Sequence, residues 1–133
     1  MTKVLVVDDE EAIRFVFQRF LSDAGYDVSL AAHENDARKI LSAQEFDVAV
    51  VDRILPGGES GLEILKAIRT SQPLCEVIMM SGMPLYQDST ESTEEESIEY
   101  LTKPVKKAEI VQAVKNAAEK SRIKKANASN SLP

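Results

Sequence analysis

Four short apolar runs of this chain end in polar residues that could act together in one chemical step. Asp8 and Asp9 follow VLVV, Asp52 follows VAVV, Ser81 follows VIMM, and Lys103 follows YLT. Three carboxylates, a hydroxyl and an ammonium suit a divalent cation together with a phosphoryl group; hard oxygen ligands favour Mg²⁺, or Mn²⁺ in its place. The residues therefore indicate chemistry at phosphorus, provided that the fold brings the ends of these runs together.

Asp52 is the candidate nucleophile of the set. It follows a wholly apolar run, so its carboxylate is expected to project into a pocket rather than into bulk water. An aspartate can attack phosphorus and form an acyl phosphate. A metal ion and Lys103 would align the groups and neutralise the charge that spreads during transfer. The alternative is that Asp52 only caps the turn that follows.

The other members of the set also have ordinary structural explanations. Asp8 and Asp9 could cap the next helix and compensate its dipole, and Lys103 could be an exposed lysine of a loop. A cis bond between Lys103 and Pro104 would aim the ammonium at the site, because proline alone makes that isomer accessible at low cost. Ser81 could donate its hydroxyl to a phosphoryl oxygen.

Repeated strand and helix units would position these side chains at one edge of a sheet. Short apolar runs alternate with helical patterns, which is typical of an α/β fold with a mostly parallel sheet. Ligand sites of such sheets lie beyond the carboxyl ends of the strands. Continuous apolar runs predict burial of the first, third and fourth strands on both faces, whereas the alternation over 26–30 predicts an edge strand. The pattern predicts five strands and about five helices, with Gly25 ending the first helix.

Size, charge and cysteine content limit the classes of function. The 133 residues form one domain of ordinary size, and a net charge of −6 argues against a general affinity for nucleic acid or anionic membrane. The single cysteine, Cys75, cannot form an internal disulfide; we expect a small buried residue at a strand start and a reducing, cytoplasmic location. No apolar stretch approaches the ~20 residues of a membrane span, and the first strand begins too early to leave room for a signal peptide.

Two segments depart from the alternating pattern. Residues 87–97 read QDSTESTEEES, with five acidic residues and no apolar one, so a helix there would have no face to bury and is expected to be short, loose or disordered. The chain from Lys120 onward is polar and mildly basic, which predicts a fraying helix end followed by a linker or terminus. The predicted organisation is a domain over 1–120 and a polar tail over 121–133.

Taken together, the motifs resemble the receiver domain of two-component response regulators over about residues 2–120. The resemblance is carried by VLVVDDE, VVDRILPGGESGLE, the Ser81–Gly82 pair and YLTKP. It implies a flavodoxin-like, doubly wound, five-stranded parallel sheet of order 2-1-3-4-5. It also implies roles for the site residues: phosphoacceptor Asp52, metal pair Asp8 and Asp9, a further metal contact from the main-chain carbonyl of Ile54, switch residues Ser81 and Tyr100, and phosphate-pairing Lys103.

The function that the resemblance implies is a phosphorylation-dependent switch of a phosphorelay. A sensor histidine kinase or phosphotransfer protein would donate the phosphoryl group to Asp52 with Mg²⁺ bound, and the domain would catalyse only its own phosphorylation and dephosphorylation. Movement of Ser81 would let the Tyr100 ring turn inward and shift an existing equilibrium toward the active surface. The partner downstream would be an effector domain or protein, without direct binding of nucleic acid or membrane by this domain. His33 is expected to be an ordinary surface residue.

Two features differ from the common pattern of that family. Many receivers carry a packed fourth helix, which often serves as the output or dimer face, where this chain has the acidic segment 87–97. The loop over 56–61 is one residue longer than its commonest form. The acidic segment concerns how the signal leaves the domain, and the longer loop is expected to be a silent variation or to alter partner docking, whereas the site itself is intact.

Two alternatives from other functional classes remain open. A Mg²⁺-dependent phosphohydrolase with an aspartyl nucleophile would want Asp-x-Asp after its first strand, but residues 8–10 read Asp-Asp-Glu. A receiver-like interaction module that is never phosphorylated agrees with the unusual acidic segment. Such modules tend to lose site residues, and all of them are present here.

Overall fold

A five-stranded parallel sheet forms the centre of the molecule in the computed structural model, which describes residues 1–53, 61–82 and 98–130. The strand order is β2-β1-β3-β4-β5, and every neighbouring pair is parallel. This confirms the predicted α/β class, the strand count and the order 2-1-3-4-5. The strands are β1 (Lys3–Val7), β2 (Asp27–Ala31), β3 (Val48–Asp52), β4 (Glu76–Ser81) and β5 (Glu99–Thr102).

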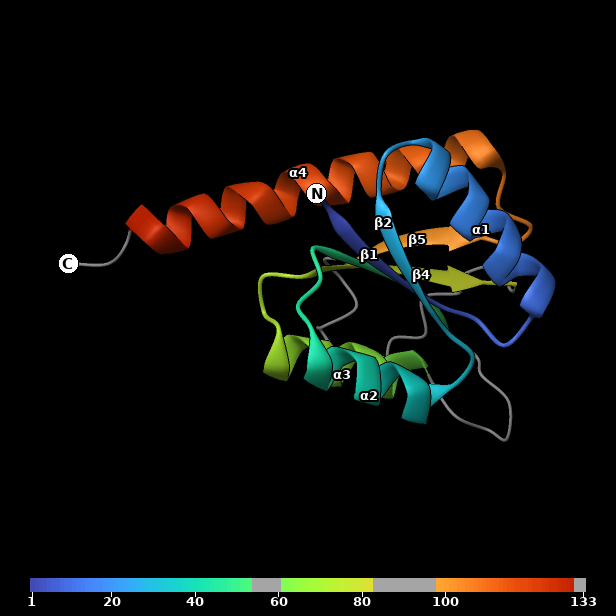
Figure 1. Ribbon diagram of the computed structural model, residues 1–133, viewed down its shortest axis with the longest axis horizontal. Helices are drawn as coiled ribbons and strands as arrows, with labels where there is room; N and C mark the ends of the chain where they lie inside the picture. The colour runs from blue at the N-terminus through green and yellow to red at the C-terminus, as the bar shows by residue number, and fades with distance from the viewer. Residues whose placement is uncertain (54–60, 83–97, 131–133) are drawn as a thin grey trace, which may run out of the picture.

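Helices cover both faces of the sheet, as a doubly wound fold requires. One face carries α1 (Glu11–Asp23) and α4 (Lys107–Asn130), and the other carries α2 (Glu34–Ala43) and α3 (Gly61–Ser71) (Figure 1). Two separate apolar cores result, one on each side of the sheet. Four helices lie in the part of the chain that the structure describes, so the predicted count of about five holds roughly. The acidic segment 87–97, the main-chain carbonyl of Ile54 and most of the loop over 56–61 lie outside the described residues.

The burial of the strands explains their sequence patterns. Val4–Val7 of β1 and Val48–Val51 of β3 are fully buried, because each strand has helices above and below it. Strands buried on both faces read as continuous apolar runs rather than as alternating ones. The alternating strand β2 lies at an edge of the sheet, as predicted. Sequence pattern and topology therefore agree on which strands are central.

Gly25 ends α1 in the way the sequence predicts. Its φ of +98° lies in the left-handed region, which glycine enters without steric cost. The amide of Gly25 donates to the carbonyl of Ser22, and the amide of Tyr26 donates to the carbonyl of Leu21. These two bonds form a Schellman motif, which turns the chain directly into β2.

Cys75 is a buried residue directly before β4, as the sequence predicts. Burial, together with the negative charges of Asp47 and Glu76, raises the pKa of its thiol to about 12. The reactive form of cysteine is the thiolate. The residue is therefore chemically inert and acts as a small apolar side chain.

Gln72 connects α3 to the segment that leads into β3. Its side-chain oxygen accepts from the amide of Phe46 at 2.7 Å, and its side-chain nitrogen donates to the carbonyls of Leu41 and Gln44 at 2.9 and 2.8 Å. A buried amide is tolerated when its donors and acceptor are satisfied in this way. The three bonds hold the approach to β3, the strand that carries Asp52.

The last helix is longer than the sequence predicts. We expected a fraying end from Lys120 onward, but α4 runs without interruption to Asn130, and Ser121 is fully buried. The helix is longer than expected because contacts with residues far away in the sequence hold this polar stretch against the sheet. Its 24 residues span about 36 Å, and Figure 1 shows the helix continuing past the sheet. None of the described helices has the length and apolarity needed to cross a bilayer.

Candidate functional site

The carboxyl ends of β1 and β3 bring Asp8 and Asp52 together. Val7 pairs with Val51 across these two strands, so the next residue of each strand lies at the same level of the sheet. Carboxylate oxygens of Asp8, Asp9 and Asp52 all lie within 4.8 Å of one another. Asp8 is fully buried, Asp52 is 6% exposed, and Asp9 faces solvent. The structure thus forms the predicted acidic cluster with one open side.

Lys103 bridges two members of this cluster. Its ammonium lies 2.8 Å from Asp52 Oδ2 and 2.9 Å from Asp8 Oδ2. The Lys103–Pro104 bond is cis, and the Lys103 amide donates to the carbonyl of Ser81 at 2.8 Å. Burial alone would lower the pKa of Lys103, but the hydrogen bond to Asp52 and the negative charges of Asp8 and Asp52 raise it overall. The lysine is therefore held as a cation at the site and is not the exposed loop residue of the alternative interpretation.

Asp8 is fixed from several directions. Its Oδ1 accepts from the amide of Glu10 at 2.9 Å, and its main-chain carbonyl accepts from the Arg14 guanidinium at 2.7 Å. The amide of Asp8 donates to the carbonyl of Ala31 on β2. The N-cap residue of α1 is Glu10, which makes no side-chain capping bond. The position of Asp8 therefore does not match simple capping of α1.

The second oxygen of Asp8 is fully buried and lacks a well-aligned hydrogen bond among the described residues. Lys103 lies 2.9 Å from it as an ion pair and supplies a single positive charge, which it shares with Asp52. A buried carboxylate oxygen without such a bond is costly unless a cation satisfies it. Three clustered carboxylates facing one ammonium also leave negative charge uncompensated. The donor set fits a hard divalent cation coordinated by oxygen.

Ser81 and Tyr100 lie on neighbouring strands and on the same face of the sheet. Tyr100 pairs with Met79, and Ser81 comes two residues after Met79 on β4. Residues two apart on a strand point to the same face. Ser81 is 5% exposed, whereas Tyr100 is partly buried against the core beneath α2 and α3. Ser81 and Tyr100 thus lie diagonally across two neighbouring strands on one face of the sheet. His33, in contrast, is exposed and pairs with Asp36.

Gly61 is a positioning residue that the sequence reading did not single out. Its amide donates to the carbonyl of Arg53 at 2.8 Å. A Cβ atom at this position would lie 2.1 Å from the main-chain oxygen of Asp52 and 3.0 Å from the Cα of Arg53. Real Cβ atoms essentially never come so close to backbone. Only glycine lets α3 begin directly against the strand end that carries Asp52.

Gly61→Ala is therefore expected to lower the free energy of unfolding by about 3 kcal/mol, because rigid backbone must move. Chemical denaturation followed by circular dichroism measures this change. Gly82→Ala is the matched control, since no described atom lies within 4 Å of a Cβ placed there. Equal stability of the two variants would contradict the steric argument.

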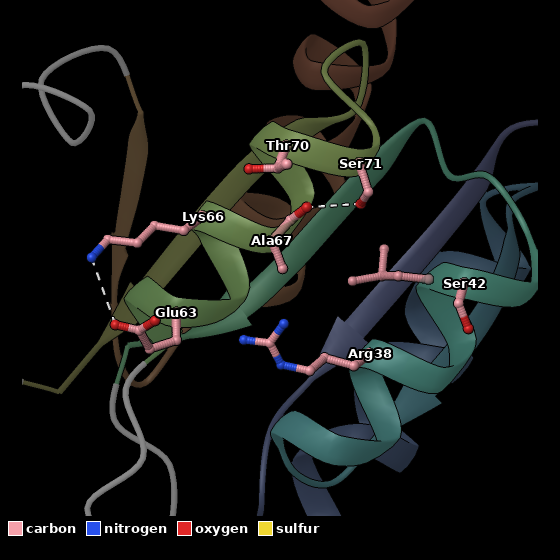
Figure 2. A pocket seen from close by; sticks show the side chains of 8 residues that line it. Arg38, Ser42, Glu63, Lys66, Ala67, Thr70 and Ser71 are labelled. Carbon is pink, nitrogen blue, oxygen red and sulfur yellow. Dashed lines mark hydrogen bonds and ion pairs between the residues drawn. The ribbon is translucent and has the colours of Figure 1, made fainter.

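A hollow between α2 and α3 offers no chemistry comparable to that of the acidic cluster (Figure 2). Arg38 pairs with Glu34 and Lys66 with Glu63, each within its own helix. The hydroxyl of Ser71 donates to the carbonyl of Ala67. These side chains do not converge on a common point as the carboxylates of the acidic cluster do. The acidic cluster is the candidate site.

Comparison with protein families and curated proteins gives a consistent result. The family model described as the response regulator receiver domain matches residues 4–115. A putative response regulator NtrX-like protein of Rickettsia felis is 34% identical over 125 residues, which is 93% of this chain and 26% of that protein. The DNA-binding transcriptional regulator NtrC of Rhizobium meliloti is 31% identical over 108 residues, 81% of this chain and 22% of that protein. The chain thus spans about a quarter of the length of these curated relatives.

Solved structures share the fold as well. A CheY-like receiver domain protein of Methanospirillum hungatei is 25% identical with a TM-score of 0.84, covering 93% of this chain and 98% of the other. Response regulator TrrA of Thermotoga maritima, solved in complex with Mg²⁺ and BeF, is 28% identical with a TM-score of 0.73. That match covers 88% of this chain and 99% of TrrA. The flavodoxin-like sheet order described above is therefore shared with proteins of this kind.

Proposed function

The chain belongs to the family of response regulator receiver domains, and on that premise we propose that Asp52 is its phosphoacceptor. A receiver domain is a phosphorylated switch of two-component signalling rather than a classical enzyme. The observation that carries the assignment is the surroundings of Asp52. Its carboxylate ends a buried strand, contacts the Lys103 ammonium at 2.8 Å and lies within the cluster formed with Asp8 and Asp9.

The proposed step moves one phosphoryl group from a histidine of a partner kinase or phosphotransfer protein. A carboxylate oxygen of Asp52 forms a new P–O bond while the P–N bond of the phosphohistidine breaks. The electron pair of the broken bond stays on the imidazole nitrogen, which takes up a proton. Lys103 remains a cation beside Asp52 and opposes the charge that develops on the phosphoryl oxygens. Later hydrolysis by water would return the free carboxylate and inorganic phosphate, so the domain would catalyse both its own phosphorylation and its own dephosphorylation.

We assign Asp8, Asp9, Asp52 and the main-chain carbonyl of Ile54 as the protein ligands of Mg²⁺, with Mn²⁺ as a substitute. The buried and poorly bonded oxygen of Asp8 supports this assignment. When bound, the metal neutralises phosphoryl oxygen charge and orients the incoming group. TrrA, whose structure holds Mg²⁺ and BeF, supports the same choice of cation.

Ser81 and Tyr100 are proposed as the switch residues. Ser81 would donate its hydroxyl to a phosphoryl oxygen on Asp52, and its movement would let the Tyr100 ring turn inward. Their placement on one face of β4 and β5 supports this pairing. The added charge would shift an existing equilibrium between two surfaces rather than create a new fold.

The wider context belongs to the same proposal. A sensor histidine kinase or phosphotransfer protein is the donor, and an effector domain or protein receives the signal in a cytoplasmic setting. Relatives about four times as long as their matched segment support a downstream effector. We keep residues 1–120 as the receiver unit and 121–133 as the polar tail that follows it.

Acetyl phosphate, a small phosphoryl donor, tests the proposal without the partner. Incubation with Mg²⁺ is expected to add one phosphoryl group per chain, visible by intact mass spectrometry, and removal of the cation with a chelator should prevent it. A wild-type chain that gains no phosphoryl group would contradict the assignment and favour a receiver-like interaction module. Rapid turnover of a generic phosphate ester would instead favour a phosphohydrolase.

A further inference from the structure

Residues 121–125 of α4 contact the sheet at the end opposite the acidic cluster, where the strands begin. The Ser121 hydroxyl donates to the carbonyl of Leu74 at 2.7 Å, in the turn before β4. Lys124 forms an ion pair with Glu76 at 3.2 Å, and Lys125 forms one with Asp47. We call these three contacts the α4 latch.

The three latch residues of the helix form a single face. Positions 121, 124 and 125 are related by spacings of three and four, which lie side by side on a helix. Ser121 is fully buried, and a buried hydroxyl without a hydrogen-bond partner is unfavourable. Its bond to the Leu74 carbonyl therefore favours this position of the helix on the sheet. The two lysines extend the contact by about one further turn. Lys120, by contrast, is exposed and is not part of this face.

The anchor points belong to the strands that carry the acidic cluster and its neighbours. Asp47 directly precedes β3, which ends in Asp52, and Glu76 is the first residue of β4, which ends in Ser81. The second carboxylate oxygen of Asp47 accepts from the amide of Lys3 at 2.8 Å, at the start of β1. The latch is therefore attached to the starts of the central strands rather than to a surface loop alone.

We propose that the α4 latch makes the end of α4 a rigid outlet, which fixes the direction in which the polypeptide leaves the receiver body. Without it, the polar stretch after Lys120 has little reason to remain helical, because it has almost no apolar face to bury. With it, the helix projects past the sheet as one continuous rod (Figure 1). Any segment joined to this end takes its orientation from β3 and β4. The outlet thus connects the strands that carry the site with any segment that is joined to the end of α4.

Distance measurements between spin labels test the rigidity of the outlet. Labels on Ser22→Cys at the end of α1 and Asn127→Cys near the end of α4 report the orientation of the helix against the body. Cys75 is buried and inert, so it does not compete for the label. The unaltered latch is expected to give one narrow distance distribution in the full chain.

The latch variant carries Ser121→Val, Lys124→Gln and Lys125→Gln, and its distance distribution should become at least about twice as wide. Its amide hydrogens in residues 121–130 should also exchange at least tenfold faster, while those of β1 and β3 keep their rates. The matched control, Lys39→Gln with Lys120→Gln, removes the same amount of charge from exposed side chains outside the latch and should behave like the unaltered chain. A broad distribution in the unaltered chain, or an equally narrow one in the latch variant, would overturn the proposal.

Asp47 gives the latch a predictable response to acid. Burial would raise the pKa of this carboxyl, but the hydrogen bonds from Lys125 and the Lys3 amide lower it overall, helped by the charges of Lys125 and the N-terminus. Lys115, Glu119 and Arg122 line a groove together with Asp47 and Lys125. Because the folded-state pKa lies below the unfolded value, the contribution of Asp47 to stability is present above the unfolded pKa and is lost as pH falls through the folded pKa.

The difference in unfolding free energy between wild type and Asp47→Asn is therefore expected to shrink as the pH falls below the ordinary aspartate range. Denaturant titrations at a series of pH values measure this difference. A gap that stays constant across that range would show that the ionised form of Asp47 adds nothing to the fold.

Discussion

Replacing Asp52 with asparagine is expected to abolish the phosphoryl adduct that acetyl phosphate and Mg²⁺ produce on the wild-type chain. An amide is a poor nucleophile toward phosphorus, so no acyl phosphate can form at this position. The fold should survive, because the amide has the shape of the carboxylate and Asp8 still holds Lys103. We expect the free energy of unfolding to stay within about 1 kcal/mol of wild type. Intact mass and chemical denaturation measure the two quantities separately.

Asp23→Asn is the matched control for this experiment. It makes the same chemical change at an exposed residue at the end of α1, where Asp23 forms an ion pair with Arg19. This variant should accept the phosphoryl group like wild type. A full adduct on Asp52→Asn would mean that another residue receives the group, and peptide mapping would then identify it.

Lys103→Met is expected to be the most destabilising single change at the site in the absence of metal. It leaves Asp8 and Asp52 close together in a buried place without their cation. Removal of one partner from a buried ion pair typically costs several kcal/mol, and we expect about 3 kcal/mol here because Lys103 is partly exposed. Part of the loss should return on addition of Mg²⁺, since a cation that binds only the folded chain stabilises it.

Lys106→Met supplies the comparison, because Lys106 is exposed and its side chain makes none of the described contacts with the acidic cluster. This variant should match wild type with and without Mg²⁺. Denaturation curves recorded at several Mg²⁺ concentrations test both variants together. A Lys103→Met protein as stable as Lys106→Met would mean that the acidic cluster does not need the lysine in order to fold.

Much of the fold could be predicted from the sequence because burial leaves a direct mark on residue type. β1 and β3 lie between two layers of helices, so every residue of Val4–Val7 and Val48–Val51 is apolar. The same logic located the site, since polar residues can follow such runs only where the strands emerge from the core. The role of Gly25 at the end of α1 could also be predicted, because its left-handed φ is a local property of the chain.

Other features could not be predicted from the sequence, because they depend on contacts between residues that lie far apart in the chain. Gly61 must be glycine because of the carbonyl of Asp52, which reaches it only after α3 has docked. Gln72 resembles a surface residue until its three main-chain partners are known. The roles of Asp8, Asp9, Asp52, Ser81, Tyr100 and Lys103, like that of the carbonyl of Ile54, remain predictions. The experiments above address Asp52, Lys103 and the divalent cation.

The sequence by itself determined the class of fold, the family and the residues that stand at the strand ends. It could do so because strand burial, turn chemistry and short motifs depend on near neighbours in the chain. Only the tertiary structure decided that Lys103 bridges Asp8 and Asp52, that one oxygen of Asp8 is left poorly bonded, and that α4 stays helical to Asn130. Each of these outcomes depends on contacts between distant segments, such as that of Ser121 with Leu74. A polar helix end looks the same in sequence whether it is free or anchored, because its partners become neighbours only when the sheet has formed.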